Sequence, residues 1–391
     1  MNDASQNSTV YTQDDDVRLL PKIIMLLQRV NPSDIFSTRD HSVDFISSRA
    51  DYISIRARVL SIVFAFLAIA WIPIDYYTMD EVVFSEFLVL RLIFSSLFVV
   101  LALWGSHCYN LYVARARIVG FIVIPGLFYL ASHMLLPENS EESIILIGYS
   151  FMPLLVMALL AIFPLTFLEG VSFITLSTLL FVTTKLIDQS MFTADALGDL
   201  WLLFLLGGIA LWVELTQLYM LMNLYREATR DALTGLVNRR ILSKKLEDEI
   251  KESERSGNDL YIMLFDLDFF KRINDTYGHK MGDFVLCHFA KILKSHCNDT
   301  IVAGRYGGEE FLAIATGHRR EEALELADSI RRSCHEAEIY NPHKDERIKF
   351  TTSVGVTRRE ANEDAGQLFS RADEELYRAK SSGRDFVAIS D

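Results

Sequence analysis

The chain has 391 residues, of which 51% are hydrophobic, and its formal net charge at pH 7 is −13. The hydrophobic excess lies before about residue 215, which indicates a membrane region followed by a soluble region and excludes an ordinary soluble protein. The acidic balance argues against a nucleic-acid surface, so no nucleic acid is expected as a partner. The cysteines lack metal-ligand spacing and are expected to be reduced thiols: Cys108, Cys287, Cys297 and Cys334.

Residues 1–58 are expected to form a cytoplasmic N-terminal tail. The tail is polar to about Asp16 and then carries a short amphipathic stretch from Val17 to Val30, without a secretory signal at its start.

Residues 59–213 contain six apolar runs that approach the length of about 20 residues needed to cross a bilayer. They are Val59 to Ile74, Phe87 to Trp104, Ile118 to Leu136, Ile144 to Phe163, Leu168 to Ile187 and Leu197 to Val213. We therefore expect an all-α bundle of six transmembrane helices in contact with membrane lipid, acting as a sensory region.

Arginines near the span ends predict how this bundle is oriented. Arg49, Arg56 and Arg58 precede the first run, and Arg115 and Arg117 lie between the second and third. The loops from residue 75 to 86 and from 137 to 143 contain no Lys or Arg, and Lys185 is the one exception to the pattern. By the positive-inside rule both termini lie in the cytoplasm.

Residues 214–230 form a helical linker with a short heptad pattern. Its apolar positions alternate in steps of four and three residues: Leu211, Leu215, Leu218, Met222, Tyr225 and Thr229. This spacing is typical of a parallel coiled coil, although it covers fewer heptads than a firm assignment needs. A single amphipathic helix that packs on its own domain is the alternative.

The soluble region, residues 231–391, contains one strand pattern and one hairpin pattern that carry acidic residues. A buried-strand pattern from Leu260 to Phe265 runs into Asp266-Leu267-Asp268. Two further strands, Thr300 to Tyr306 and Phe311 to Ala315, flank Gly307-Gly308-Glu309-Glu310 and predict a hairpin. Taken alone, such a turn is usually a solvated hairpin.

If the hairpin lies beside the first strand, Asp266 and Glu309 converge on one hard cation. Mg²⁺ is typically held by one or two carboxylates together with substrate phosphates, and it serves phosphoryl transfer. Lys271, at the start of the following helix, adds a positive charge for a triphosphate.

Four motifs in order resemble the catalytic domain of the GGDEF family of diguanylate cyclases, in its GGEEF form. They are the segments 231–240 (DALTGLVNRR), 266–275 (DLDFFKRIND) with 278–283 (GHKMGD), 305–311 (RYGGEEF) and 372–380 (ADEELYRAK) with Gly383-Arg384. Together they span about 160 residues, the size of one domain. The resemblance implies a cytosolic α/β, nucleotidyl-cyclase-like domain with a central, mostly antiparallel sheet.

The resemblance also implies the reaction and its participants. Two GTP molecules would be condensed to cyclic di-GMP and two pyrophosphates by a homodimer with Mg²⁺, or Mn²⁺, as cofactor. The protein would lie in a bacterial inner membrane, and its product would act on cyclic di-GMP receptors. The domain would be regulated by the membrane region.

Residue roles follow from the same resemblance. Asp266, the Leu267 carbonyl and Glu309 would hold the metal, and Glu309 or Glu310 would receive the proton of the 3′-hydroxyl. Asp268 is either a supporting or a structural residue and is not assigned to the metal. Lys271 would stabilise the charge on the phosphates, and the remaining substrate-binding residues would be Asn274, His279, Asp283, Lys380 and Arg384.

Several of these residues have structural alternatives. Asn274 and Asp275 could form a helix C-cap, and Asp283 could cap the following helix. Lys380 and Arg384 could be ordinary cations near a helix C-terminus.

One departure from the family pattern predicts a functional difference. Many members carry an Arg-x-x-Asp pair that binds product and inhibits the enzyme. This chain has Asn298 and Ile301 at those positions, so product inhibition through that site is expected to be missing or weak.

Three other functions remain as alternatives. The domain could be a silent nucleotide receptor, or a cyclase with relaxed purine choice, which Asp283 argues against. The membrane region could be a transporter, whose mark would be buried polar groups. The candidates are Arg91, His133 and Glu169, of which Arg91 is expected to extend to the membrane interface.

Overall fold

The computed structural model describes residues 32–39, 41–105, 110–135, 149, 151–187, 189–341 and 345–390. The expected amphipathic stretch up to Val30 and Cys108 lie outside the described residues. The chain divides into two compact units, Met1–Leu224 and Tyr225–Asp391.

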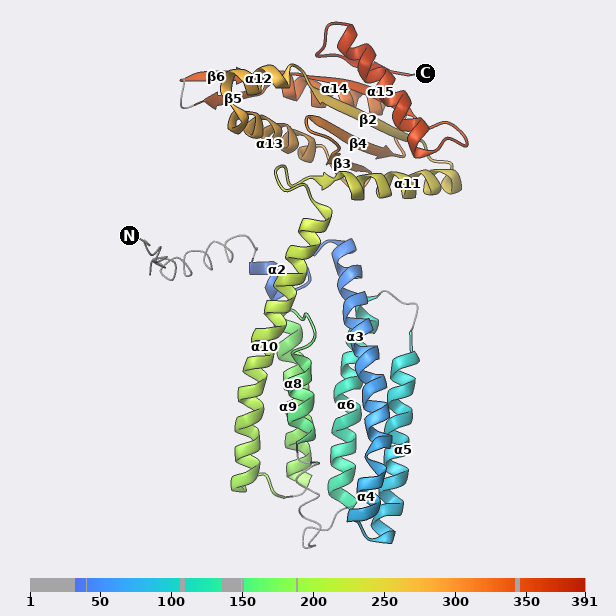
Figure 1. The fold of residues 1–391 in the computed structure, drawn as a ribbon, viewed down its shortest axis with the longest axis vertical. Helices are drawn as coiled ribbons and strands as arrows, with labels where there is room; N and C mark the ends of the chain where they lie inside the picture. The colour runs from blue at the N-terminus through green and yellow to red at the C-terminus, as the bar shows by residue number, and fades with distance from the viewer. Residues whose placement is uncertain are drawn as a thin grey trace, which may run out of the picture. The chain divides into compact units, whose positions relative to one another are not determined.

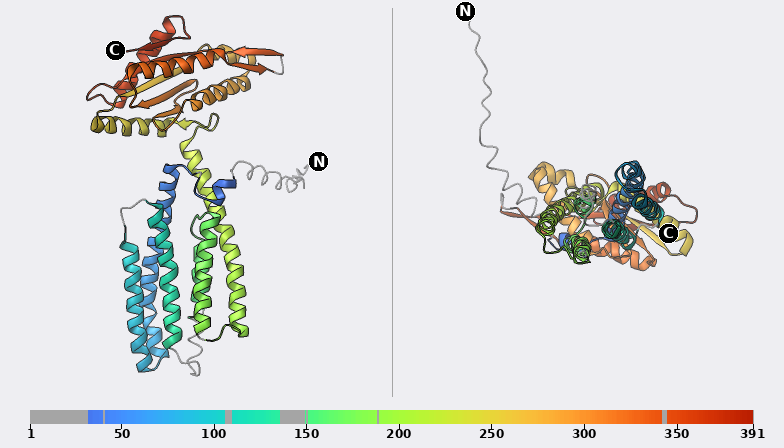
Figure 2. Two further views of the ribbon diagram at one scale, coloured as in Figure 1. Left: turned by 180° about the vertical axis from the view of Figure 1, so that it is seen from behind. Right: turned by 90° about the horizontal axis from the view of Figure 1, so that it is seen from below.

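The described part of the first unit is helical. Its elements are α2 (Pro32–Phe36), α3 (Val43–Ala70), α4 (Ile72–Thr78), α5 (Glu81–Leu103), α6 (Leu111–Leu135), α8 (Met152–Leu160), α9 (Phe167–Ile187) and α10 (Ala194–Thr229). The long helices lie side by side, as the view along them shows (Figure 2).

Five helical segments among the described residues are long and apolar enough to cross a membrane. They are 43–78, α5, α6, α9 and α10, and they overlap the first, second, third, fifth and sixth predicted runs. Of the fourth run, the structure describes α8 and its flanks, while residues 144–148 and 150 lie outside the described part. The predicted count of six is therefore not confirmed.

Two of these helices, α3 and α10, extend farthest beyond the predicted runs. Helix α3 begins at Val43, where the Ser42 side chain caps it by accepting a hydrogen bond from the backbone N–H of Phe45. Helix α10 continues without interruption through the predicted linker to Thr229. In this single chain Leu218 and Met222 are buried, as expected if the helix packs on its own domain, and the coiled coil remains a prediction.

Several charged side chains inside the first unit form ion pairs. Glu169 at the start of α9 contacts both Arg49 of α3 and Arg115 of α6, and the Arg115 Nη2–Glu169 Oε1 distance is 2.5 Å. Arg91 of α5 is 5% exposed and pairs with Asp75 of α4. The prediction that Arg91 extends to the interface is therefore wrong, because a carboxylate inside the bundle neutralises it.

The second unit is built on a six-stranded sheet with the strand order β1-β3-β4-β2-β7-β8. Its strands are β1 (Val237–Asn238), β2 (Leu260–Leu267), β3 (Ile301–Arg305), β4 (Glu310–Thr316), β7 (Thr352–Arg358) and β8 (Val387–Ile389). The outer pairs β1–β3 and β7–β8 are parallel and the inner pairs are antiparallel. This confirms the predicted mostly antiparallel sheet, and the β5 (Glu338–Asn341) and β6 (Glu346–Lys349) hairpin lies outside it.

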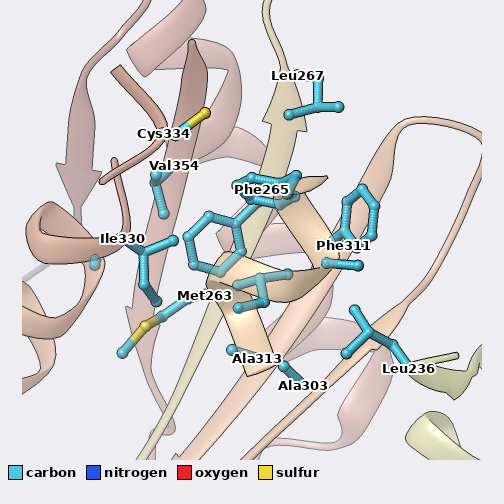
Figure 3. Close-up of a cluster of buried hydrophobic side chains, with 14 of the residues drawn as sticks. Leu236, Met263, Phe265, Leu267, Ala303, Phe311, Ala313, Ile330, Cys334 and Val354 are labelled. Carbon is cyan, nitrogen blue, oxygen red and sulfur yellow. The ribbon is translucent and has the colours of Figure 1, made fainter. Parts of the chain in front are cut away.

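Helices cover both faces of this sheet (Figure 1). The elements are α11 (Arg239–Ser256), α12 (Phe270–Tyr277), α13 (His279–Ser295), α14 (Arg320–Glu336) and α15 (Ala365–Ser381). Every residue of β2 is buried, because alternate side chains enter two separate apolar clusters. Met263 and Phe265 pack with residues of α13 and α14 (Figure 3), whereas Ile262 and Leu264 pack with residues of α11 and α15.

Helix α15 lies unusually close to β7, and a glycine makes this possible. A Cβ at Gly355 would lie 2.2 Å from the backbone oxygen of Ala372 and 2.4 Å from the backbone nitrogen of Leu376. The close approach fixes the C-terminal end of α15, which carries Lys380, beside the sheet.

Candidate active site

The acidic site lies where β2 ends beside the start of β4. Asp266 of β2 is directly opposite Glu310 of β4 and Ser353 of β7. The backbone N–H of Leu267 donates to the carbonyl of Glu309 at 3.3 Å. The structure therefore brings the predicted hairpin beside the predicted strand, as the convergence of Asp266 and Glu309 requires.

Arg305 holds the glycine turn in place. Its guanidinium donates to the carbonyl of Gly307 at 3.1 Å and to that of Gly308 at 2.7 Å. It also pairs with Asp231 at 3.2 Å, just after the end of α10. Burial alone would raise the pKa of Asp231, but hydrogen bonds from Thr234 and the charge of Arg305 lower it below its ordinary value.

The contacts of Arg305 with the glycine turn and with Asp231 were not predicted from the sequence, although Arg305 and Asp231 both lie in recognised motifs. Arg305 stands directly before the glycines and Asp231 opens the first motif. A guanidinium next to a turn is a usable signal, because only its fork can bind two carbonyls and a carboxylate together.

Lys380 places a positive charge inside the acidic site. Its Nζ lies 2.8 Å from Asp266 Oδ2, and Asp266 is only 7% exposed. The alternative that Lys380 is merely a helix-terminal cation is thus insufficient, because its charge is directed at the most buried acid of the site.

Burial raises the pKa of both acids. Burial raises the pKa of Asp266 above its ordinary value, although the ammonium of Lys380 opposes this rise. Burial and then the charge of Asp266 raise the pKa of Glu309. Two carboxylates that each resist ionisation in this way are stabilised by a shared cation.

Asn274 and Asp283 lie on the two helices that follow β2. Asn274 is in α12, and the Cβ of an alanine at position 282 would lie 1.9 Å from its Oδ1. Gly282 therefore gives the Asn274 amide the space that it occupies. Asp283 is exposed and lies inside α13, whose N-cap is Gly278, so the capping alternative for Asp283 is wrong. The C-cap of α12 is also Gly278, not Asn274 or Asp275.

His279 and Lys271 are exposed at the start of α13 and α12, respectively. His279 lines a cavity of about 680 Å³ with Phe284 and Tyr340. Lys271 has no ion pair with another residue in the described part of the chain. The structure therefore brings Lys380, but not Lys271, into contact with the acids.

Asp268 has a structural role. Its carboxylate accepts hydrogen bonds from the hydroxyls of Ser353 and Thr351, both at 2.7 Å, and from the backbone N–H of Asp385 at 3.0 Å. It thereby holds the turn that contains Arg384, whose guanidinium lies 4.4 Å from the ring centre of Phe269.

The donor set suits a cation that keeps much of its own hydration. Among the described residues no group of three or more His, Cys, Asp or Glu side chains could enclose a metal. Two carboxylates and a backbone carbonyl instead match the way Mg²⁺ is held together with substrate phosphates.

Comparison with known proteins agrees with this site. Residues 228–385 match the family model described as "Diguanylate cyclase, GGDEF domain". Residues 228–385 form a GGDEF domain. The signature of this domain is the segment Gly307 to Phe311.

Named relatives share this domain. The chain is 38% identical over 164 residues to the diguanylate cyclase DgcP of Pseudomonas aeruginosa, covering 42% of this chain and 24% of that protein. It is 40% identical over 161 residues to the response regulator PleD of Caulobacter vibrioides, covering 41% and 36%, respectively. The chain thus spans about a quarter to a third of these relatives.

Solved structures include similar domains. One is the GGDEF domain of DgcB from Caulobacter crescentus in complex with c-di-GMP, which is 31% identical in sequence. The alignment covers 41% of this chain and 95% of that domain, with a TM-score of 0.41. Another is the active GGEEF domain of a diguanylate cyclase from Vibrio cholerae, which is 33% identical in sequence. The alignment covers 40% of this chain and 98% of that domain, with a TM-score of 0.37.

Proposed function

We propose that this protein is a membrane-bound diguanylate cyclase that condenses two GTP into cyclic di-GMP and two pyrophosphates. One observation carries the proposal: Lys380 pairs with Asp266 at the end of β2, beside the turn that holds Glu309. The two helices that follow β2 carry Asn274 and Asp283. The GGDEF domain and its similarity to named diguanylate cyclases support the proposal.

The acids are proposed to hold Mg²⁺, or Mn²⁺, through Asp266, Glu309 and the Leu267 carbonyl. The fit rests on the raised pKa values of the acids and on the ammonium that Asp266 already binds. When bound, the ion would neutralise charge on the triphosphate and lower the pKa of the attacking hydroxyl.

The protein residues then act on a bound GTP in defined ways. The 3′-hydroxyl oxygen of each GTP attacks the α-phosphorus of the other, and the bond from that phosphorus to the bridging oxygen breaks, releasing pyrophosphate. Glu309 or Glu310 receives the hydroxyl proton. Lys380, Arg384 and Lys271 stabilise the negative charge on the phosphates. Lys380 would release Asp266 Oδ2 to take this role, which would leave that oxygen available to hold the ion.

Guanine selection is proposed to rest on Asn274 and Asp283, with His279 close to the same substrate. A carboxylate accepts from N1–H and the 2-amino group of guanine together, whereas adenine offers an acceptor at N1. A site built to accept those donors rejects a base that lacks them.

The reaction needs two half-sites, so the working form is proposed to be a homodimer. The exposed part of α10 that continues toward the domain would bring two copies together at high local concentration. The membrane unit would change how often the half-sites meet, in response to a signal.

The membrane orientation follows from where the arginines gather. Arg49, Arg115 and Glu169 form one ionic cluster that joins the N-terminal ends of α3, α6 and α9. Placing this end in the cytoplasm follows the positive-inside rule and puts the catalytic domain where GTP is found. The membrane would be a bacterial inner membrane, and the product would act on separate receptors.

Product inhibition at the usual Arg-x-x-Asp site is proposed to be lost. The Oδ1 of Asn298 accepts hydrogen bonds from the Thr300 backbone and hydroxyl, both at 2.9 Å. Ile301 is 6% exposed in the core. Both side chains are thus committed within the domain.

The proposal is tested by incubating detergent-solubilised full-length protein with equal GTP and ATP and Mg²⁺, followed by mass analysis. Cyclic di-GMP should be the main product. Mixed or adenine products would support relaxed purine choice, and GTP that binds without turnover would support the receptor alternative.

A further inference from the structure

The first unit contains a cavity that the proposed cyclase chemistry does not use. Its volume is about 350 Å³, within the range of small-molecule sites. The walls come from α3, α4, α5, α6 and α8 and are mainly apolar, with Phe64, Phe94 and Phe128 all buried. A site of this size and composition suits an apolar molecule.

One wall of the cavity is polar and firmly built. The Arg91 guanidinium borders the cavity while its Nε and Nη2 bind Asp75, at 3.1 Å for Nη2 to Oδ1. Nη2 also contacts the Tyr149 hydroxyl at 2.5 Å, and that hydroxyl donates to Asp75 at 2.8 Å. Asp75 and Tyr149 therefore orient the Arg91 guanidinium in the absence of a ligand.

One nitrogen of the Arg91 guanidinium is still available to donate a hydrogen bond. Among the described residues, the Nη1 of Arg91 has no hydrogen-bond partner, although the side chain is only 6% exposed. Because Asp75 already balances the charge of Arg91, an anionic ligand would leave an unneutralised negative charge in an apolar site. The matching group is therefore a neutral acceptor, such as a carbonyl oxygen.

The rim of the cavity indicates where the ligand comes from. Leu67, Trp71, Ile74 and Leu155 line it and are between 44% and 52% exposed. Leu67, Trp71 and Ile74 belong to the segment 43–78, which is long and apolar enough to cross a membrane, so we infer that the opening faces the lipid phase rather than water.

We propose that this cavity binds a neutral, membrane-soluble molecule with a carbonyl oxygen, the chemistry of a quinone or a long-chain ketone. The apolar body would lie among the phenylalanine rings and its oxygen would accept from Arg91 Nη1. Such a site gives the membrane unit a chemical stimulus to detect. Binding itself does not depend on the proposed cyclase reaction.

The test uses the full-length protein in lipid nanodiscs and a short-chain 1,4-benzoquinone as a quencher of tryptophan fluorescence. Trp71 lies at the rim, so the signal that a Trp71→Phe variant lacks reports the cavity. Saturable quenching of that signal is expected. Quenching that rises only linearly with quinone in the membrane would overturn the proposal.

A cavity-filling variant provides the matched control. Ala68 is 4% exposed and lines the cavity, whereas Ala70 on the same helix is exposed and does not. Ala68→Phe should weaken binding at least about tenfold, as expected when added ring atoms occupy a packed site. Ala70→Phe should leave it unchanged, and equal behaviour of the two variants would contradict the assignment.

Competition identifies the chemical class. At equal membrane concentrations, 2-undecanone should displace the quinone and undecane should not, because undecane lacks an acceptor. Displacement by both alike would mean that Arg91 takes no part in recognition. Stronger displacement by undecanoate would show an anion site. Either result would overturn the proposal, and neither depends on GTP turnover.

Discussion

Replacing Lys380 with methionine should change metal binding and turnover in opposite directions. The ammonium lies 2.8 Å from Asp266 Oδ2, so it competes with a divalent ion for that oxygen. At this distance and an effective dielectric constant of about 20, the two charges interact by at most about 6 kcal/mol. The Lys380 side chain is 32% exposed, and screening by water reduces this to roughly 1–2 kcal/mol.

The variant should therefore bind Mn²⁺ about 5- to 30-fold more tightly in the absence of nucleotide, as measured by electron paramagnetic resonance of free Mn²⁺. Its turnover of GTP should fall by roughly two orders of magnitude, because a phosphate-binding cation is lost. Lys251→Met, at an exposed position of α11, is the control and should change neither. Unchanged or weaker Mn²⁺ binding by Lys380→Met would refute the competition between the ammonium and the metal for Asp266 Oδ2.

Four further outcomes are expected. Gly282→Ala should raise KM for GTP about tenfold with a smaller effect on kcat, because its methyl group displaces the Asn274 amide; an unchanged KM in steady-state assays would contradict this. Asp283→Asn should raise KM for GTP by roughly 10- to 100-fold and reduce the preference for GTP over inosine triphosphate, which a retained preference would disprove. Because the raised pKa of Asp266 favours its protonated form in the folded state, that stabilisation is present below about pH 4 and is lost as the pH rises through the folded pKa. Metal-free Asp266→Asn should therefore melt above wild type at pH 7 but not in acid, and a lower melting temperature at pH 7 would count against the burial argument. Progress curves should stay linear as cyclic di-GMP accumulates, because Ile301 is in the core; early curvature that is reversed by removing product would reveal an inhibitory site.

The GGDEF domain was largely predictable because its signals are local. The apolar run before Asp266 is β2, and the glycine turn joins β3 and β4 as expected. A strand that is buried on both faces gives an uninterrupted apolar run, and its polar end marks the site edge. Ordered motifs then located the domain that the family model matches.

Contacts between distant residues were not predictable in the same way. The sequence did not show that Lys380 rests on Asp266, or that Asp268 supports the Arg384 turn, because those pairs meet only through the packing of α15 and β7 on β2. Whether Asp268 binds a metal or supports the turn depends on the direction of its carboxylate, which the sequence does not give.

The first unit, residues 1–224, shows the limits of prediction from hydropathy. Hydropathy located five of the long helices but placed the start of the first run too late, because α3 also contains polar residues that are buried against neighbouring helices. Arg91 was predicted to extend to the interface because it lies close to the end of a predicted run. Its partner Asp75 lies 16 residues away in a different helix, and a hydropathy average does not reveal such a pair.

The most direct test of the account is the stoichiometry of product formation by full-length protein in nanodiscs with GTP and Mg²⁺. Wild type should release two pyrophosphates for each cyclic di-GMP formed, and Asp266→Asn should form neither above background. A wild-type protein that leaves GTP intact, or an Asp266→Asn variant as active as wild type, would contradict the proposed metal-dependent cyclase.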